Sequence, residues 1–436
     1  VAYAATLGMD MIVTDHHSIQ RDEDGRDMLP PALAVINPKQ QGDPYPFKDL
    51  AGVGIAFKLV QALIRSDKEE PISGTPVKLN TGDLLDLVAL GTVADVAPLL
   101  GENRILVQLG LNSLNGRTRD GRNTGPRRAG LQALFGEAKL APGKVNSHTI
   151  GFVIGPRLNA AGRLGSARVG YDLLVSPTME TARPLAAELG ELNHQRQDMT
   201  RQFVEQAREM LAALESVPYL SFIAGEDFHP GVVGLVAGRL AEELYRPAVV
   251  AEIGPTETRG SCRSIPEFNI TSALDDCRDL LIRHGGHAAA AGFTLKNEDL
   301  PELRRRLEVI AGEKLQGLDL APTLKIDAEL DLADLDYAVC ARLAELEPHG
   351  DANPQPVFAA HGVHVAGDSV RLVGREGQHL KMRVKAPGSS TEWDAIGFGM
   401  GALAGSLAGK LDLAYSIEVN DYTGRPQLTL RDLRQA

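Results

Sequence analysis

Three consecutive residues, Asp15, His16 and His17, combine an acid with two imidazoles directly after a short apolar stretch, 11–14. Residues 1–9 predict a short helix before it. A helix, a tight turn and a buried strand form one αβ step of a parallel sheet, and sites in such sheets lie beyond the carboxyl ends of the strands. There an imidazole can bind a metal ion through one nitrogen while a carboxylate holds the other. The alternative is a helix N-cap at Asp15 followed by two surface histidines.

Asp95 is a single acid within the otherwise apolar stretch 92–99, which follows a predicted helix over 83–90. A carboxylate that is buried in apolar surroundings is costly unless it is paired or bound to a metal ion. We therefore expect Asp95 to be buried and to be paired or metal-bound.

The segment 155–163 combines small residues with Arg157, Asn159 and Arg163. Small residues let the backbone come close to a ligand, and guanidinium and amide groups donate fork-like hydrogen bonds to phosphate oxygens. One interpretation is therefore a phosphate-binding segment. The other is a Pro/Gly turn with solvated arginines.

A second candidate phosphate contact lies in 258–264, which has the pattern of a strand. Alternation points Ser261 and Arg263 to the same side, and a hydroxyl beside a guanidinium suits a terminal phosphate. The alternative is an exposed strand face without a ligand.

His287 follows two glycines, which predicts a flexible turn that carries an imidazole. Physical reasoning alone also allows a buried core histidine at this position.

The composition is that of a globular chain of 436 residues with 43% hydrophobic and 23% charged residues. No apolar run approaches the ~20 residues that span a bilayer, and no signal-peptide pattern is visible, so we expect no membrane partner. The three scattered cysteines form neither a disulfide framework nor a zinc spacing, which predicts a cytoplasmic location. The sequence contains no Walker-type loop, so nothing indicates work driven by nucleoside triphosphates.

The charge distribution is uneven. The net charge of −12 argues against a generally basic nucleic-acid-binding protein. Residues 101–170, however, contain eleven Lys and Arg residues and three acids, a local net charge of +8. We call residues 101–170 the basic island. Such a cluster of positive charge in an otherwise acidic chain can guide a polyanion to one place. The alternative, for the arginines between 117 and 128, is a solvated loop rich in glycine and asparagine.

The patterns of apolar residues predict an α/β multidomain fold in four parts. Residues 1–180 predict an α/β domain with a parallel sheet, and 181–217 predict a long connecting helix. Residues 218–316 predict a second α/β domain. In 317–436, short alternating strands predict a small β-barrel.

The Asp-His-His tripeptide, the Asp95 segment, the 155–164 segment and the Gly-Gly-His segment occur in an order that resembles the DHH phosphoesterase superfamily. Within it, they resemble the RecJ family of single-strand-specific 5′→3′ DNA exonucleases. The resemblance covers essentially the whole chain. It implies a partial DHH domain, the connecting helix, a DHHA1 domain and a C-terminal OB-fold barrel. His349 and Ala352 depart from the family pattern, in which an aromatic residue and a glycine are expected.

The resemblance also implies a mechanism and residue roles. Hydrolysis is expected to use two Mn²⁺ or Mg²⁺ ions roughly 3.5–4 Å apart, which activate water and hold the attacking and leaving oxygens. His16 and Asp95 are the expected metal ligands. Asp15 is expected to orient His16 or complete the metal shell, and His17 to face the scissile phosphate. The expected substrate-binding residues are Arg157, Asn159, Arg163, Ser261, Arg263 and His287.

The implied substrate is single-stranded DNA, with a preferred 5′ phosphate, which is degraded to mononucleotides in DNA repair and recombination. A single-strand-binding protein or a helicase is an implied partner. One alternative is a DHH-family oligoribonuclease or cyclic-dinucleotide phosphodiesterase, but such proteins resemble only the first two domains. Another is a catalytically silent single-strand-binding protein, against which the intact tripeptide and Asp95 argue.

RecJ-like proteins carry two further acidic motifs upstream of the tripeptide, and none precedes Asp15 here. We therefore expect N-terminal sequence to be missing. One imidazole and one or two carboxylates cannot hold two hard cations closely, so we expect these 436 residues alone to bind single-stranded DNA weakly without cleaving it. We also expect the first domain to be the least stable, with a central strand exposed as an edge.

Overall fold

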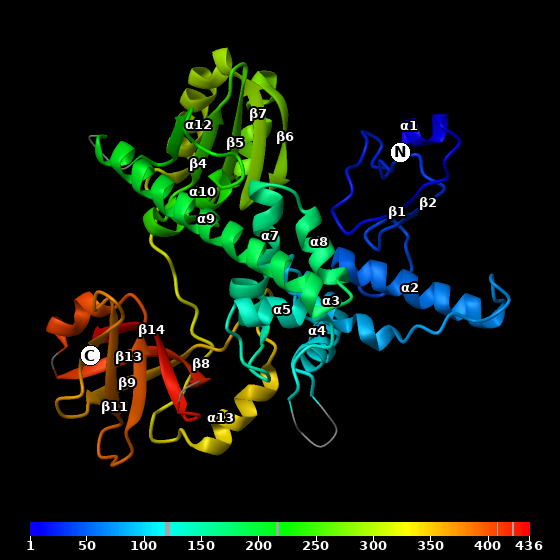
Figure 1. The fold of residues 1–436 in the computed structure, drawn as a ribbon. Coiled ribbons are helices and arrows are strands. Elements are labelled where there is room, and N and C mark those ends of the chain that lie inside the picture. Colours follow the sequence, from blue (N-terminus) through cyan, green and yellow to red (C-terminus); the bar gives the residue numbers. More distant parts are fainter. Residues whose placement is uncertain (118–122, 215–217, 408, 421–422) are drawn as a thin grey trace. The chain divides into compact units, whose positions relative to one another are not determined.

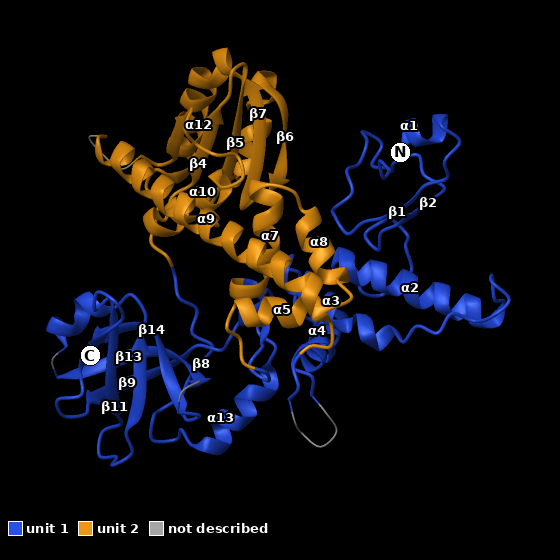
Figure 2. Ribbon diagram, viewed as in Figure 1, with its two compact units in different colours: residues 1–125, 142–151, 323–436 blue, residues 126–141, 152–322 orange. Residues whose placement is uncertain are grey.

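The computed structural model describes residues 1–117, 123–214, 218–407, 409–420 and 423–436. The chain forms two compact units (Figure 2). Unit 1 comprises residues 1–125, 142–151 and 323–436, and unit 2 comprises residues 126–141 and 152–322. Within the described ranges, no helix is long and apolar enough to cross a membrane.

Unit 1 contains a helical part with a small parallel sheet, and a separate seven-stranded sheet (Figure 1). Its elements in chain order are α1 (Ala2–Thr6), β1 (Ile12–Thr14), β2 (Ala34–Ile36), α2 (Gly52–Glu69), α3 (Leu85–Ala94), α4 (Gly101–Leu114), α6 (Ser147–Thr149), β8 (Ala328–Glu329), α13 (Tyr337–Leu343), β9 (Phe358–Val365), β10 (Arg371–Val373), β11 (His379–Lys385), β12 (Trp393–Gly397), β13 (Lys410–Val419) and β14 (Pro426–Gln435).

The strands β1 and β2 pair in parallel, with Val13 opposite Val35. The prediction that β1 is a buried strand is wrong, because Ile12 is 55% exposed. Among the described residues β1 has only β2 as a neighbour, so its other edge is unpaired and its side chains are covered incompletely. The parallel pair nevertheless places the residues that follow β1 at the carboxyl edge of a sheet, as predicted.

Helices α2, α3 and α4 pack on one another and form the base below this edge. Leu50, Ile55, Phe57, Val88 and Leu106 are its buried core. The close approach of α3 and α4 depends on Gly110, because a Cβ atom there would lie only 2.3 Å from the Leu85 carbonyl oxygen. This packing fixes the C-terminal end of α3, where Asp95 lies.

The seven-stranded sheet has the strand order β10-β11-β12-β14-β13-β9-β8, and β11 also pairs with β9. This additional pairing closes the sheet into a ring, so the predicted C-terminal OB-fold barrel is confirmed. Tyr415 and Trp393 lie in its core, and the Tyr415 hydroxyl donates a hydrogen bond to the Leu330 carbonyl at 2.7 Å.

The segment before β9 contacts the start of α4. Arg104 donates hydrogen bonds to the carbonyls of Glu345, Leu346 and Glu347 at 2.9–3.1 Å. One arginine of the basic island therefore has a structural partner within the chain. Arg119 and Arg122 of the same island lie outside the described residues.

Unit 2 consists of a helical group and a five-stranded sheet. Its elements in chain order are α5 (Ala129–Glu137), α7 (Gly155–Leu164), α8 (Arg168–Val175), α9 (Met179–Ala212), β3 (Ser221–Gly225), α10 (Val233–Leu244), β4 (Ala248–Ile253), β5 (Glu257–Arg263), α11 (Ile270–Asp275), β6 (Leu281–His287), β7 (Ala290–Lys296) and α12 (Leu300–Leu315).

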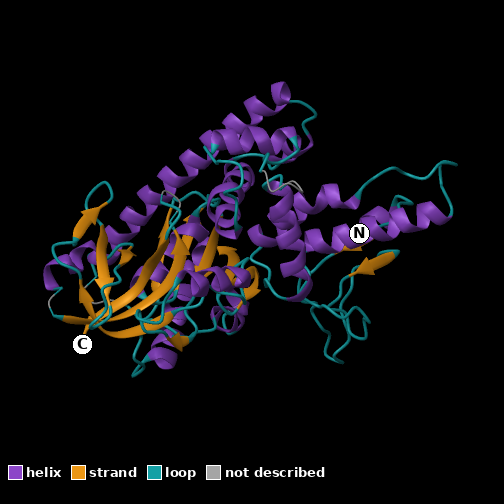
Figure 3. Ribbon diagram, turned by 90° about the horizontal axis from the view of Figure 1, so that it is seen from below, coloured by secondary structure: helices purple, strands orange, loops and turns teal. Residues whose placement is uncertain are grey.

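The sheet of unit 2 has the order β3-β4-β5-β7-β6, in which β3 and β4 are parallel and the other pairs antiparallel. On one face, a core that includes Phe203 of α9 and Val236 of α10 packs on β3 and β4. On the other face, Leu274 of α11 and Leu303 of α12 pack against Phe293. Figure 3 shows the strands in orange and the helices in purple.

The long helix predicted between the two α/β parts is α9, which begins at the cap residue Thr178 and extends to Ala212. The Thr178 hydroxyl accepts a hydrogen bond from the Thr181 amide at 3.3 Å, which satisfies one of the free donors at the helix start. Helices α5 and α7 pack along it, so it is the spine of unit 2. The domain boundaries predicted from the sequence stay predictions.

Candidate functional site

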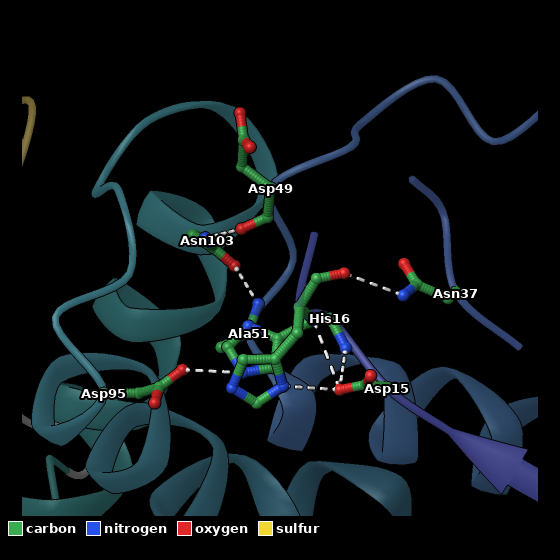
Figure 4. Close-up of polar contacts among 8 residues, drawn as sticks. Asp15, His16, Asn37, Asp49, Ala51, Asp95 and Asn103 are labelled. Carbon is green, nitrogen blue, oxygen red and sulfur yellow. Dashed lines mark hydrogen bonds and ion pairs between the residues drawn. The ribbon is translucent and has the colours of Figure 1, made fainter. Parts of the chain in front are cut away.

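The tripeptide lies at the carboxyl end of β1, and its three side chains have different partners (Figure 4). Asp15 Oδ1 accepts hydrogen bonds from the His16 and His17 amides at 2.8 and 3.2 Å, and lies 2.7 Å from His17 Nδ1. Partial burial raises the pKa of Asp15, but the hydrogen bonds from His17 and His16 outweigh this and hold the pKa below its ordinary value. The side chain of Asp15 thus pairs with the ring of His17 and not with the ring of His16, while the alternative that Asp15 completes the metal shell stays a prediction.

The ring of His16 faces Asp95. Its Nε2 atom lies 3.3 Å from Asp95 Oδ2. The ring also lies over Gly52 at the first turn of α2, because a Cβ atom at Gly52 would be 3.4 Å from His16 Cδ2. The structure therefore brings together two of the residues that the sequence singled out, and adds Gly52, which lies against the ring.

Asp95 is not buried, which corrects the premise on which it was selected. Its side chain is 44% exposed. The reason is that α3 ends at Ala94 and the backbone then turns outward through Val96, which has a φ of +54°. Asp95 is thus presented to solvent at a helix end and directed toward His16.

Asn103 holds the two segments that carry Gly52 and Asp95. It is fully buried, and its side-chain amide donates to the carbonyls of Asp49 at 2.6 Å and Pro98 at 3.1 Å. Its side-chain oxygen accepts from the Ala51 amide at 3.5 Å. In the same way, Asn37 donates to the His17 carbonyl at 3.0 Å. Sequence reasoning missed both asparagines, because a buried asparagine leaves no mark in the pattern of apolar residues.

The donor chemistry of this site fits a divalent cation in part. An imidazole nitrogen and a carboxylate oxygen directed at each other are ligands that Mn²⁺ and Mg²⁺ accept. In the part of the chain that the structure describes, however, no group of three or more His, Cys, Asp or Glu side chains is arranged to hold a metal ion. His16 and Asp95 are therefore two candidate ligands, and the described residues bring no third to them.

In unit 2, the segment predicted as a phosphate-binding segment is helix α7 and not a turn. Asn159 and Arg163 lie four residues apart and share one side of the helix. Arg163 donates to the Gly231 carbonyl at 3.2 Å. Arg157 lies on another side, donates to the Val153 carbonyl at 2.8 Å, and burial lowers the pKa of its guanidinium. Arg157 is therefore the weakest of these three candidates.

Ser261 and Arg263 lie on the same face of β5, as alternation predicted. Arg263 Nη1 donates to Ser261 Oγ at 3.2 Å. Helix α10 passes close to both through Gly234, where a Cβ atom would be 2.9 Å from Ser261 Oγ. The hydroxyl and the guanidinium thus form one compact donor group.

Arg163 lies near this donor group, and Arg196 lies near Arg163. Burial and the nearby charge of Arg163 lower the pKa of Arg263, and the same two causes lower the pKa of Arg196 on α9. The Arg196 guanidinium donates to Asn193 Oδ1 at 3.0 Å, and its Nε atom is buried without a hydrogen-bond partner among the described residues. Sequence reasoning missed Arg196 because no motif marks it within the long helix. The concentration of positive charge suits an anion.

His287 does not lie in a flexible turn, which corrects the sequence prediction. It ends strand β6, and it is exposed. The two glycines before it stay in the strand ladder because Gly286, with a φ of +153°, adopts a conformation that other residues avoid. In the strand register His287 is opposite Ala290, which is opposite Arg263. Ser261, Arg263 and His287 are therefore on one face of the sheet.

Comparison with known proteins assigns the family. The DHH family N-terminal domain matches residues 1–92, the DHHA1 domain matches residues 215–313, and the RecJ OB domain matches residues 326–432. A single-stranded-DNA-specific exonuclease RecJ from Bacillus subtilis is 37% identical over 98% of this chain and 51% of its own length. The protein of the same name from Salmonella typhimurium is 35% identical over 99% of this chain and 74% of its own length.

The fold agrees with these matches. The crystal structure of RecJ in complex with Mn²⁺ from Thermus thermophilus has a TM-score of 0.78 and 29% identity, and the match covers 100% of this chain and 60% of that one. A crystal structure of exonuclease RecJ bound to manganese is 31% identical with a TM-score of 0.55. The chain spans about half the length of the Bacillus relative and about three quarters of the Salmonella relative. With all three domains matched in order, this chain belongs to the RecJ family of DHH proteins.

Proposed function

We propose that the protein that carries this chain is a metal-dependent exonuclease that hydrolyses single-stranded DNA from the 5′ end to mononucleotides. The observation that carries the proposal is the pairing of His16 with Asp95 at the carboxyl edge of the β1–β2 sheet. An edge of this kind is where catalytic groups gather in α/β proteins. The RecJ names of the relatives, and the Mn²⁺ or Mg²⁺ in their crystal structures, support the same assignment.

The proposed roles follow from the contacts. His16 and Asp95 hold a divalent cation, which belongs to a two-metal site in our proposal, and such ions supply an activated water at neutral pH. The hydrogen bond that His17 Nδ1 donates to the Asp15 carboxylate fixes the ring of His17, so that His17 can stabilise charge on the scissile phosphate. Gly52 leaves room for the His16 ring, and Asn103 fixes the segments on both sides of it.

The proposed substrate contacts lie in unit 2. Ser261 and Arg263 bind the 5′ phosphate, because their donors converge and neither has a carboxylate partner among the described residues. Arg163, Asn159 and His287 contact the sugar-phosphate backbone in this proposal, and Arg157 has at most a minor part. The basic island guides the strand, while the C-terminal barrel gives a further single-strand surface.

The biological setting is also a proposal. DNA repair and recombination in the cytoplasm, with a single-strand-binding protein or a helicase as partner, fit a single-strand exonuclease. We propose the domain order 1–180, 181–217, 218–316 and 317–436 for the DHH domain, connecting helix, DHHA1 domain and OB-fold domain.

The test is a degradation assay with Mn²⁺ and single strands that carry a label at one end. Stepwise release of labelled mononucleotides from the 5′ end, with no cleavage of a duplex, supports the proposal. Preference for diribonucleotides or cyclic dinucleotides would instead assign a small-substrate phosphodiesterase. Strand binding without any metal-dependent cleavage by the whole protein would assign a silent binding protein.

A further inference from the structure

One face of the unit 2 sheet carries more cationic groups than the terminal-phosphate contact needs. Directly opposite residues of antiparallel strands lie on the same face. The register of β5, β7 and β6 therefore gives three successive rows on one face: Arg259 with Thr294 and Arg283, Ser261 with Gly292 and Gly285, and Arg263 with Ala290 and His287. The opposite face carries the apolar residues Cys262 and Phe293.

The first two rows line a cleft. It has a volume of about 420 Å³, and Arg259, Ser261, Arg283 and Thr294 are among the residues that border it. The cleft exists because α10 packs on β4 and β5, and the face formed by β7 and β6 lies beyond it. Arg259 and Arg283 are exposed at its edge.

The floor of the cleft consists of glycines. A Cβ atom at Gly285 would have no atom within 4 Å, and one at Gly292 would meet only the Gly260 carbonyl oxygen at 3.6 Å. Neither glycine has a positive φ. The chain's own packing and backbone conformation therefore do not require glycine at either position, whereas a ligand that approaches the backbone does.

Among the residues that the structure describes, the two arginines of the first row have no carboxylate partner. Arg283 donates from Nε to Thr294 Oγ1 at 3.1 Å, which uses one of the five N–H donors of its guanidinium. Arg259 makes no hydrogen bond or ion pair with any described residue, although Glu252 is opposite it on β4. By contrast, Arg304, Arg305 and Arg306 of α12 are all paired with Glu or Asp. In an acidic chain, unpaired arginines around a glycine floor suit an anionic ligand.

We propose that Arg259 and Arg283 form a second phosphate subsite, which binds another phosphate group of the DNA strand whose terminal phosphate binds at Ser261 and Arg263. The inference rests on the proposed function of that terminal contact. Arg259 and Arg263 are four residues apart in β5, about 13 Å at the rise of an extended strand. A single phosphate group therefore does not fill both rows, and a strand with successive phosphates does.

The test is the affinity of the 436-residue chain for a fluorescent single strand with a 5′ phosphate, measured by anisotropy over a range of salt concentrations. Arg259→Gln and Arg283→Gln are each expected to weaken binding about tenfold, equivalent to about 1.4 kcal/mol. Each should also reduce the slope of log affinity against log salt by about 0.7, the value for one lost phosphate contact on a single strand. The matched control, Arg305→Gln on α12, should change neither quantity.

A second variant tests whether binding depends on free space in the cleft as well as on the charge of the arginines. Gly285→Ala places a methyl group in the cleft without touching other residues, so it should weaken binding while the salt slope stays unchanged. Both arginine variants should keep the preference for a 5′ phosphate over a 5′ hydroxyl, which belongs to Ser261 and Arg263. Loss of that preference in Arg263→Gln alone tests the terminal contact independently of the new subsite.

Unchanged affinity and salt slope in both arginine variants would overturn the proposal. Competition by thymidine 5′-monophosphate identifies the source of the phosphate. If the strand occupies the subsite, the mononucleotide competes equally well with wild type and with Arg283→Gln. If Arg283→Gln weakens only competition by the mononucleotide, the cleft holds the released product, and the assignment to the strand is wrong.

Discussion

His16 Nε2 lies 3.3 Å from Asp95 Oδ2, although one residue follows a strand and the other ends a helix. Two residues outside the predicted set maintain this relationship. Gly52 leaves space for the ring, and Asn103 fixes the segments before α2 and after α3. The candidate metal ligands are thus positioned by packing of α2, α3 and α4, and not by the tripeptide alone.

Gly52→Val is expected to displace the His16 ring, because its Cβ would already lie 3.4 Å from the ring and its methyl groups would lie closer. Mn²⁺ affinity, measured by calorimetry, should fall about tenfold or more, the range for a misoriented metal ligand. Gly136→Ala on α5, where a Cβ meets no atom within 4 Å, is the matched control. Equal Mn²⁺ affinity in Gly52→Val and wild type would show that the ring is free to adjust.

Asn103→Ala is expected to destabilise unit 1 by about 1–3 kcal/mol, because it leaves the buried Asp49 and Pro98 carbonyls and the Ala51 amide without their partner. Urea denaturation measures the change. Asn112→Ala on the exposed side of the same helix is the control and should have little effect. A stability loss in Asn103→Ala no larger than in the control would mean that water replaces the amide.

Ala352→Gly is expected to stabilise the protein by about 1 kcal/mol, since Ala352 has a φ of +56° and only glycine adopts the left-handed region without cost. This conformation fits the glycine that the resemblance to the RecJ family leads us to expect at this position. Ala341→Gly on helix α13 should change stability in the opposite direction. Thermal unfolding of both variants gives the comparison, and a lower melting temperature for Ala352→Gly would contradict the account.

Arg263→Gln is expected to weaken binding of a strand with a 5′ phosphate far more than binding of a strand with a 5′ hydroxyl. The reason is that its guanidinium and the Ser261 hydroxyl are in contact, and no carboxylate of the described residues pairs with them. Anisotropy with the two strands measures the ratio. An equal loss on both would make Arg263 a general backbone contact.

The fold was predictable where the signal is local. Alternation in β5 placed Ser261 and Arg263 on one face, and the apolar and helical patterns gave β2, α9 and the barrel. The burial of Asp95 was predicted wrongly, because an apolar run does not reveal that the chain turns outward at Val96. His287 was predicted in a turn because two successive glycines usually indicate one. In the structure both glycines belong to strand β6, since Gly286 adopts an unusual φ.

The site was only partly predictable. The sequence singled out the candidate ligands His16 and Asp95. The partner of the Asp15 side chain, however, depends on the direction of the side chains after β1, which residue spacing does not specify. Asn103 and Arg196 were missed because their burial comes from contacts between distant segments. The cleft between Arg259 and Arg283 required the strand register.

The most direct test of the account is Mn²⁺ binding to the 436-residue chain and its variants, followed by calorimetry or by the electron paramagnetic resonance of free Mn²⁺. His16→Ala and Asp95→Ala should each reduce the affinity at least tenfold, because each removes one of the two ligands that the described residues bring together. His17→Ala, in the same tripeptide but held by Asp15, should leave Mn²⁺ binding nearly unchanged. With so few ligands, the wild-type chain on its own should bind Mn²⁺ weakly and release few mononucleotides. Wild-type Mn²⁺ affinity in both His16→Ala and Asp95→Ala would contradict the assignment of these two residues as the metal ligands.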